Sequence, residues 1–121
     1  MSKKAGRVSA PSMVVFTDLD GTLLRHEDYS WLPARAALAE LRRRRIPLVI
    51  ASSKTRAEIV RWRSRLGNRD PFISENGGAL CIPPGATPRT IPLASMNRGY
   101  LCVRFGAGYP RLRGCLKIIS R

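Results

Sequence analysis

The sequence predicts an α/β fold built around a parallel sheet. Continuous apolar runs at residues 13–16 and 48–51 are typical of strands that are buried on both faces. Each run is followed by a polar segment and then by apolar residues at helical spacing. Strands that alternate with helices in this way form parallel sheets with right-handed crossovers.

Two amphipathic helices are predicted around these runs. The first begins near Pro33, which suits a first helical turn, and ends in the cations of Arg42–Arg45, where the helix dipole favours positive charge. The second spans residues 56–66, because Thr55 and Glu58 have the spacing of a capping box. The apolar residues that face the core from these helices are Ala34, Leu38, Leu41, Ile59, Trp62 and Leu66.

The rest of the chain continues the alternation with shorter elements. The predicted order is strand Phe72–Ile73, a turn at residues 76–78, strands Ala79–Ile82, Thr90–Leu93 and Tyr100–Phe105, and a helix at Tyr109–Ser120. Residues 1–12 are expected to form a flexible basic tail. The three cysteines, which lack metal-binding spacing, are interpreted as buried thiols in a reducing, cytoplasmic compartment.

Composition narrows the classes of partner. The formal net charge of +14 raises nucleic acid as a candidate, but the basic residues are spread along the chain and no recognition motif accompanies them. Nucleic acid is therefore not the expected partner. No apolar run approaches the roughly 20 residues that span a bilayer, so no membrane partner is expected.

Three polar clusters are expected to meet at one edge of the sheet. Asp18, Ser52 and Glu75 each follow the carboxyl end of a predicted strand. Ligands of open α/β sheets bind beyond these ends. We therefore expect the clusters to form one site.

Asp18 and Asp20 are the candidate catalytic and metal-binding residues. Two carboxylates so close together repel one another unless a cation holds them, and Mg²⁺ prefers a few carboxylates together with water and phosphate oxygens. An Asp carboxylate can attack phosphorus, and a second Asp can exchange protons with the leaving oxygen and with water. The pattern predicts Mg²⁺-dependent phosphoryl transfer, in preference to an ordinary turn with two solvated acids.

Four other residues are candidates for binding phosphate or substrate. Ser52, next to a helix N-terminus, suits a phosphate oxygen, since Thr55 fills the capping role better. Lys54 adds positive charge for an anionic substrate, although it is also compatible with a solvated surface lysine. Asn76 and Gly77 are compatible equally with a tight hairpin turn and with substrate contact.

The residues also resemble a known family. DLDGTLL after an apolar strand resembles the first motif of the haloacid dehalogenase (HAD) superfamily, and IPLVIASSKTRAEI and DPFISENGGALCIP resemble its mannosyl-3-phosphoglycerate phosphatases. The resemblance implies a HAD-like Rossmannoid sheet, with a partial core at residues 13–93 and the start of a cap domain at residues 94–121. It implies that Asp18 is the nucleophile and a Mg²⁺ ligand. Asp20 is then the acid/base and a second ligand through its backbone carbonyl, and Ser52 holds the phosphoryl group.

The implied reaction is hydrolysis of 2-O-mannosyl-3-phosphoglycerate, a phosphorylated sugar acid, to mannosylglycerate and phosphate, a step of mannosylglycerate biosynthesis. Members of that family are longer and carry a later lysine and a later acidic motif, neither of which occurs here. We therefore expect a truncated chain with impaired activity, whose first strand presents an apolar edge for self-association. A phosphatase for another sugar phosphate, and an inactive fragment or basic nucleic-acid-binding module, remain as alternatives.

Overall fold

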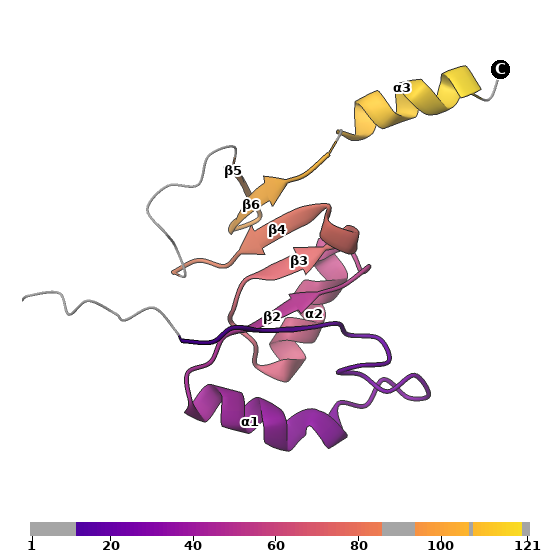
Figure 1. The fold of residues 1–121 in the computed structure, drawn as a ribbon. Coiled ribbons are helices and arrows are strands. Elements are labelled where there is room, and N and C mark those ends of the chain that lie inside the picture. Colours follow the sequence, from indigo (N-terminus) through magenta and orange to yellow (C-terminus); the bar gives the residue numbers. More distant parts are fainter. Residues whose placement is uncertain (1–11, 86–93, 107, 120–121) are drawn as a thin grey trace, which may run out of the picture.

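The structure is a computed structural model, and it describes residues 12–85, 94–106 and 108–119 (Figure 1). Its elements in chain order are β1 (Val15–Thr17), η1 (Leu32–Ala34), α1 (Arg35–Arg43), β2 (Leu48–Ala51), α2 (Arg56–Leu66), β3 (Phe72–Ser74), η2 (Glu75–Gly77), β4 (Ala79–Ile82), β5 (Ala94–Asn97), β6 (Tyr100–Arg104) and α3 (Tyr109–Ile119). No helix among these residues is long and apolar enough to cross a membrane.

The strands form one mixed sheet in the order β1-β2-β3-β4-β6-β5. β1, β2 and β3 are parallel, as the alternation of strands and helices predicted. β4, β6 and β5 add to the sheet as antiparallel strands. The α/β fold class is confirmed, and its parallel part is the part that carries the candidate site residues.

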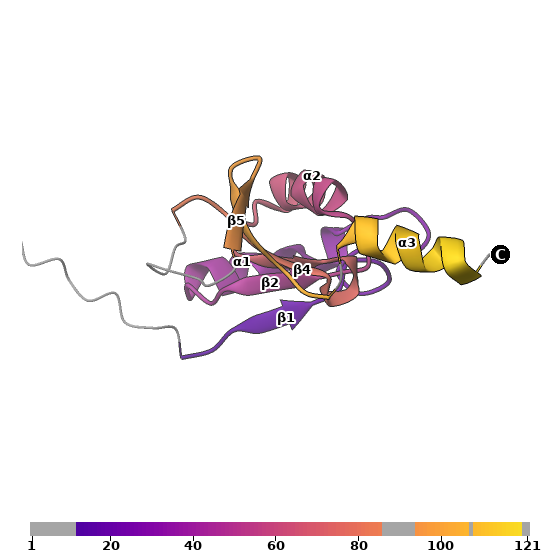
Figure 2. The same cartoon turned by 90° about the horizontal axis from the view of Figure 1, so that it is seen from above.

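Helices α1 and α2 supply the same hydrophobic core (Figure 2). Leu38 of α1 lies in one buried cluster with Ile59 and Leu66 of α2. The strand residues of this cluster are Leu48, Ile50, Phe72, Cys81 and Cys102. Two successive right-handed crossovers in the same direction place both helices on one face of a sheet, which explains the shared core.

The prediction that the first strand is buried on both faces is wrong. β1 comprises three residues and lies at the edge of the sheet, where β2 is its only strand partner among the described residues. Phe16 pairs with Val49 but keeps 63% of its surface exposed, and Val14 just before the strand keeps 43%. A continuous apolar run does not distinguish a strand covered on two faces from one covered on one face.

The predicted helix α2 is confirmed at both ends. Thr55 precedes it in extended conformation, its hydroxyl accepts a hydrogen bond from the Glu58 amide, and the Glu58 carboxylate accepts one in return from the Thr55 amide. Gly67 ends it in the left-handed conformation, with φ of 66°. These hydrogen bonds between side chains and backbone amides fix the start of the helix at Thr55, directly after the loop of residues 52–54.

The C-terminal half differs in detail from the prediction. The hairpin of β3 and β4, the strand β6 and the helix α3 are confirmed. The predicted strand Thr90–Leu93 and the tail of residues 1–11 lie outside the described residues. The sequence analysis missed β5, whose signal is the turn before β6, where Arg98 and Gly99 have φ of 48° and 84°.

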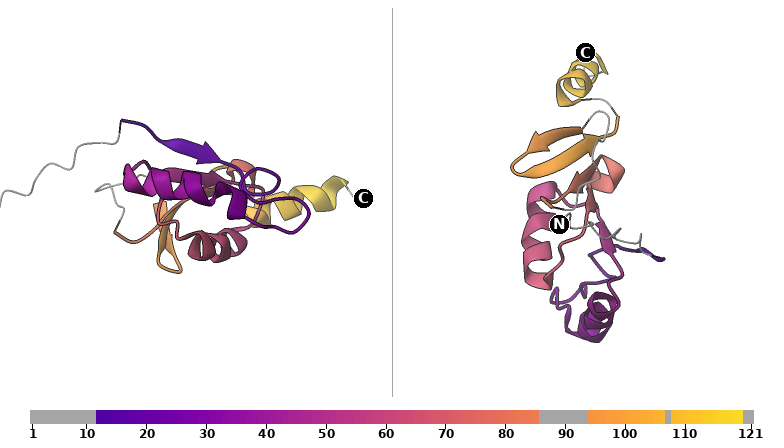
Figure 3. Two further views of the ribbon diagram at one scale, coloured as in Figure 1. Left: turned by 90° about the horizontal axis from the view of Figure 1, so that it is seen from below. Right: turned by 90° about the vertical axis from the view of Figure 1, so that its left-hand side faces the viewer.

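β6 and then β5 continue the sheet beyond β4 (Figure 3). The predicted boundary between the core and the cap domain, at residue 93, stays a prediction. Cys81 and Cys102 are buried, as expected for small apolar side chains. The same expectation is wrong for Cys115, which is exposed on α3. Nothing in the spacing of the cysteines distinguished the three.

Candidate active site

The carboxyl ends of the three parallel strands bring the predicted polar clusters together. Asp18, Ser52 and Glu75 follow directly on β1, β2 and β3. The strand registers pair Thr17 with Ile50 and Ala51 with Ile73, so the ends lie nearly level. The predicted convergence on one rim of the sheet is confirmed.

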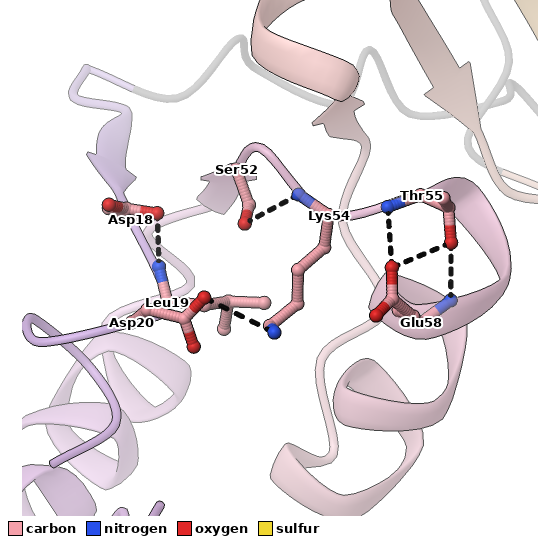
Figure 4. Close-up of polar contacts among 7 residues, drawn as sticks. All are labelled: Asp18, Leu19, Asp20, Ser52, Lys54, Thr55 and Glu58. Carbon is pink, nitrogen blue, oxygen red and sulfur yellow. Dashed lines mark hydrogen bonds and ion pairs between the residues drawn. The ribbon is translucent and has the colours of Figure 1, made fainter. Parts of the chain in front are cut away.

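An ion pair joins the first two clusters. The ammonium nitrogen of Lys54 lies 3.2 Å from Oδ2 of Asp20, and Figure 4 shows the two side chains reaching toward one another across their loops. The side chain of Lys54 keeps only 18% of its surface exposed. Its hydrogen bond to Asp20 raises the pKa of Lys54, so the ammonium keeps its charge throughout the neutral range. Of the two interpretations, the solvated surface lysine is excluded.

Asp18 and Asp20 flank a buried anchor. Leu19 between them is fully buried, and its amide donates a 2.7 Å hydrogen bond to Oδ1 of Asp18 (Figure 4). Asp18 is exposed and Asp20 is half-buried. Gly21 follows with φ of 72°, a left-handed conformation that favours glycine in this turn.

Asp18 and Asp20 provide oxygen donors of the kind that suits Mg²⁺. Oδ1 of Asp20 is buried and has no hydrogen-bond partner among the described residues, which leaves it for proton exchange with a ligand, while the backbone carbonyl of Asp20 is the oxygen expected to face Mg²⁺. Carboxylate oxygens are what Mg²⁺ prefers, and the ion typically completes its shell with water and phosphate oxygens. No group of three or more His, Cys, Asp or Glu side chains gathers around such a position among the described residues. The fit therefore rests on Asp18 and Asp20 alone.

Ser52 is held in place by the backbone around it. It is buried, its amide donates to the Ile73 carbonyl at 3.0 Å, and its hydroxyl oxygen accepts from the Lys54 amide at 3.2 Å (Figure 4). The hydroxyl proton is left to donate to another acceptor. Thr55 performs the helix capping, as predicted, so the hydroxyl of Ser52 is not needed for it.

The loop after β3 is a tight turn tied to the loop after β2. Glu75, Asn76 and Gly77 have positive φ values of 53°, 53° and 92°. The amide of Glu75 donates to the Lys54 carbonyl at 3.0 Å, and that of Asn76 donates to the Ser52 carbonyl at 3.1 Å. The turn predicted for Asn76 and Gly77 is confirmed. The other interpretation of Asn76 and Gly77, contact with substrate, stays a prediction. Both residues are exposed at the rim.

The sequence analysis missed one aromatic residue at the site. The ring of Tyr29 lies 5.8 Å from the ammonium nitrogen of Lys54 and 6.3 Å from the ring of Trp62. A cation over an aromatic face is attracted by the ring quadrupole. An aromatic residue within an otherwise polar loop was the only signal available for it.

Comparison with known proteins shows the family of the chain. Residues 15–86 match the family model of haloacid dehalogenase-like hydrolases. This stretch contains β1 to β4 and every candidate site residue named above.

Curated relatives carry the names that the resemblance implied. Two proteins named glucosyl-3-phosphoglycerate/mannosyl-3-phosphoglycerate phosphatase, from Methanococcoides burtonii and Persephonella marina, are each 43% identical over 108 residues, which is 89% of this chain and 40% of each relative. The mannosyl-3-phosphoglycerate phosphatase of Pyrococcus furiosus is 39% identical over 105 residues, covering 86% of this chain and 42% of the relative. The chain thus spans about two fifths of the length of these relatives.

Solved structures agree on the fold. A haloacid dehalogenase-like hydrolase from Bacillus subtilis superposes with a TM-score of 0.61 at 23% identity, covering 88% of this chain and 33% of the other. A hypothetical protein from Geobacillus kaustophilus gives the same TM-score at 21% identity, covering 89% of this chain and 36% of the other. The chain belongs to the family of haloacid dehalogenase-like hydrolases.

Proposed function

We propose that this chain carries the nucleophile half of a Mg²⁺-dependent phosphatase that hydrolyses 2-O-mannosyl-3-phosphoglycerate to mannosylglycerate and phosphate. The observation that carries the proposal is the 3.2 Å ion pair between Asp20 and Lys54. It joins a loop with two carboxylates to a loop with a hydroxyl and a cation, the combination that phosphoryl transfer requires. The names of the relatives at 39–43% identity support the choice of substrate.

Asp18 is the proposed nucleophile. Its carboxylate is exposed, and the Leu19 amide holds one of its oxygens, which leaves the other for attack on phosphorus. Attack forms an aspartyl-phosphate and breaks the bond to the glycerate oxygen. Asp20, two residues later, gives a proton to that oxygen and then takes one from the water that hydrolyses the intermediate.

The neighbouring loop binds the transferring group. The hydroxyl of Ser52 donates to a phosphoryl oxygen, and the ammonium of Lys54 offsets negative charge. Mg²⁺ held by Asp18 and Asp20 would add positive charge at the phosphate when it is bound. Asn76 and Gly77, exposed at the same rim, are proposed to contact the sugar-acid part of the substrate.

The activity is best tested in two proteins, because this chain spans about 40% of the length of the relatives. One is the 121-residue chain itself. The other is a hybrid in which this chain replaces the 108-residue stretch that it matches in the Methanococcoides burtonii relative. Phosphate release from mannosyl-3-phosphoglycerate is measured with and without Mg²⁺.

We expect the hybrid to be active with Mg²⁺ and the Asp18→Asn hybrid to lose on the order of 10⁴-fold or more in kcat. Asparagine can still accept the hydrogen bond from Leu19, so the variant is expected to fold normally. A folded hybrid without activity, or one indifferent to Asp18→Asn, would overturn the proposal.

The choice of substrate needs its own comparison. Two of the relatives are named for both glucosyl- and mannosyl-3-phosphoglycerate. A panel of these two compounds and simpler sugar phosphates is therefore assayed with the hybrid. If simple sugar phosphates are hydrolysed equally well, the enzyme is a phosphatase for another sugar phosphate.

We also propose a cytoplasmic location, in keeping with free thiols at all three cysteines.

A further inference from the structure

Two cysteines face each other across neighbouring strands of the sheet. Cys81 of β4 and Cys102 of β6 are directly opposed in the antiparallel ladder. Their sulfur atoms are 3.1 Å apart, and both are free thiols with at most 2% of their surface exposed. Neither residue takes part in the chemistry proposed at the rim.

The strand pairing suits a covalent bond between them. Directly opposed residues of antiparallel strands have Cα atoms about 4.5–5.5 Å apart. Disulfides span Cα separations of about 4.4–6.8 Å. A bond between Cys81 and Cys102 therefore needs little movement of the backbone.

A hollow leads from the surface to the pair. It has a volume of about 620 Å³, and both cysteines line it together with Arg56 of α2 and Arg104 of β6. Because both side chains are almost fully buried, we expect a small neutral oxidant to reach the sulfurs from this hollow through local opening of the fold. The positive charge of Arg56 favours the thiolate of Cys81, but burial has the larger effect and raises the pKa of the thiol to about 12. Reaction is therefore expected to be slow at neutral pH and faster in alkali.

We propose that Cys81 and Cys102 form an oxidation site that hydrogen peroxide converts to a reversible intrachain disulfide. The Cys81 thiolate attacks one oxygen of the peroxide, which breaks the O–O bond, gives a sulfenic acid and releases hydroxide. The Cys102 sulfur then attacks the sulfenic sulfur, its proton leaves, and the sulfenic oxygen departs as water. In sum, two thiols are oxidised, one peroxide is reduced, and two waters form.

This site is independent of the proposed phosphatase function. The disulfide would join β4 to β6 at the end of the sheet that does not carry Asp18 and Asp20. A reductant such as dithiothreitol returns the two thiols. The oxidised and reduced chains therefore differ in one covalent link across the antiparallel strands.

The test uses the full chain with Cys115→Ser, which removes the exposed thiol and leaves only the pair. The folded protein is treated with hydrogen peroxide in the presence of dimedone, which traps sulfenic acids. Intact mass and a peptide map are then recorded before and after dithiothreitol. A second protein carries Cys102→Ala as well, so that nothing can resolve a sulfenic acid at Cys81.

We expect the Cys115→Ser chain to lose both thiols, to give a linked Cys81–Cys102 peptide without dimedone, and to recover in dithiothreitol. The doubly substituted chain should instead acquire dimedone at Cys81, at a rate that increases about tenfold for each unit that the pH rises while it stays below the thiol pKa. Dimedone on the pair in the Cys115→Ser chain would overturn the proposal. So would a pair that stays reduced while Cys115 of the unsubstituted chain is fully oxidised.

Discussion

The ammonium nitrogen of Lys54 lies 3.2 Å from Oδ2 of Asp20, which links the loop after β1 to the loop after β2. The contact satisfies one oxygen of Asp20, while the other is buried without a partner in the part of the chain that the structure describes. Lys54 therefore orients the proposed acid/base and also carries charge to the place where a phosphate is expected. Its removal should affect catalysis more than folding.

We expect Lys54→Met to lower kcat/KM of the hybrid phosphatase by roughly 30-fold, because a charge-assisted hydrogen bond contributes about 2 kcal/mol. The free energy of unfolding should fall by less than about 1 kcal/mol, as is usual for partly exposed ion pairs. Lys54→Arg keeps the charge and is the matched control. Steady-state kinetics and urea unfolding give both quantities. Equal kcat/KM for Lys54→Met and the unsubstituted hybrid would contradict the assignment.

A second prediction concerns acid stability. Hydrogen bonds from Arg43, and next from Arg44, lower the pKa of Glu40 from 4.5 to about 2. Because this pKa is lower in the folded chain, the stabilisation is present above pH 4.5 and is lost as the pH falls toward 2. The thermal midpoint of the Glu40→Gln chain should therefore decrease less between pH 4.5 and pH 2 than that of the unsubstituted chain.

Glu27→Gln is the control for that experiment. It removes the same charge from an exposed loop residue, whose carboxylate lies 3.6 Å from Arg25. Midpoints are recorded by circular dichroism at several pH values. If both variants change the pH profile by the same amount, the effect comes from net charge and not from the contacts of Glu40.

Arg63 is expected to be the most costly charged residue to replace. It is 4% exposed and donates to the Asp70 carbonyl, the Tyr100 hydroxyl and the Asn68 side chain. Its guanidinium also lies 4.9 Å from the ring centre of Phe72, and burial lowers its pKa. Arg63→Met removes these three hydrogen bonds and should cost about 3 kcal/mol of unfolding free energy, although the Asn68 side chain keeps a bond from the Asp70 amide.

The matched variant is Arg61→Met, on the exposed face of the same helix. It should change the stability by no more than about 0.5 kcal/mol. Urea midpoints of the two variants at one pH provide the comparison. Similar midpoints would show that the buried bonds of Arg63 contribute little.

The edge of the sheet at β1 is expected to drive self-association. Phe16 is 63% exposed on a strand whose outer edge has no partner among the described residues. Unpaired apolar edges readily pair with other chains, and a charge at such an edge prevents it. Phe16→Lys should therefore shift the chain toward monomer in sedimentation velocity at increasing concentration. Phe105→Lys replaces another exposed phenylalanine (58%) and should not shift the chain toward monomer. If the unsubstituted chain is already a monodisperse monomer, the prediction is wrong.

Local signals in the sequence predicted most of the site. The capping box of Thr55 and Glu58 located α2 and therefore the loop that holds Ser52 and Lys54. The apolar run before Asp18 located β1, and the parallel topology then placed the loops side by side. These are local patterns or simple consequences of chain order, which explains why they could be read without a structure.

What the sequence did not reveal depends on contacts between distant residues. Phe16 and Val49 are equally apolar, and only the position of β1 at an edge exposes one of them. Arg63 belongs to a chain full of exposed arginines, and only its acceptors on other elements mark it as buried. The approach of Tyr29 to Lys54 likewise depends on how two loops fold against each other.

The bonds that join the loops after β2 and β3 come from the main chain. The carbonyls of Ser52 and Lys54 accept from the amides of Asn76 and Glu75, so among replacements only proline at the two donor positions removes the N–H that these bonds need. The hydrogen bonds between the two loops therefore depend little on which side chains the loops carry. We therefore expect a replacement of Asn76 that tolerates its φ of 53°, such as glycine, to alter the proposed substrate contact while the segment with Ser52 and Lys54 keeps its position.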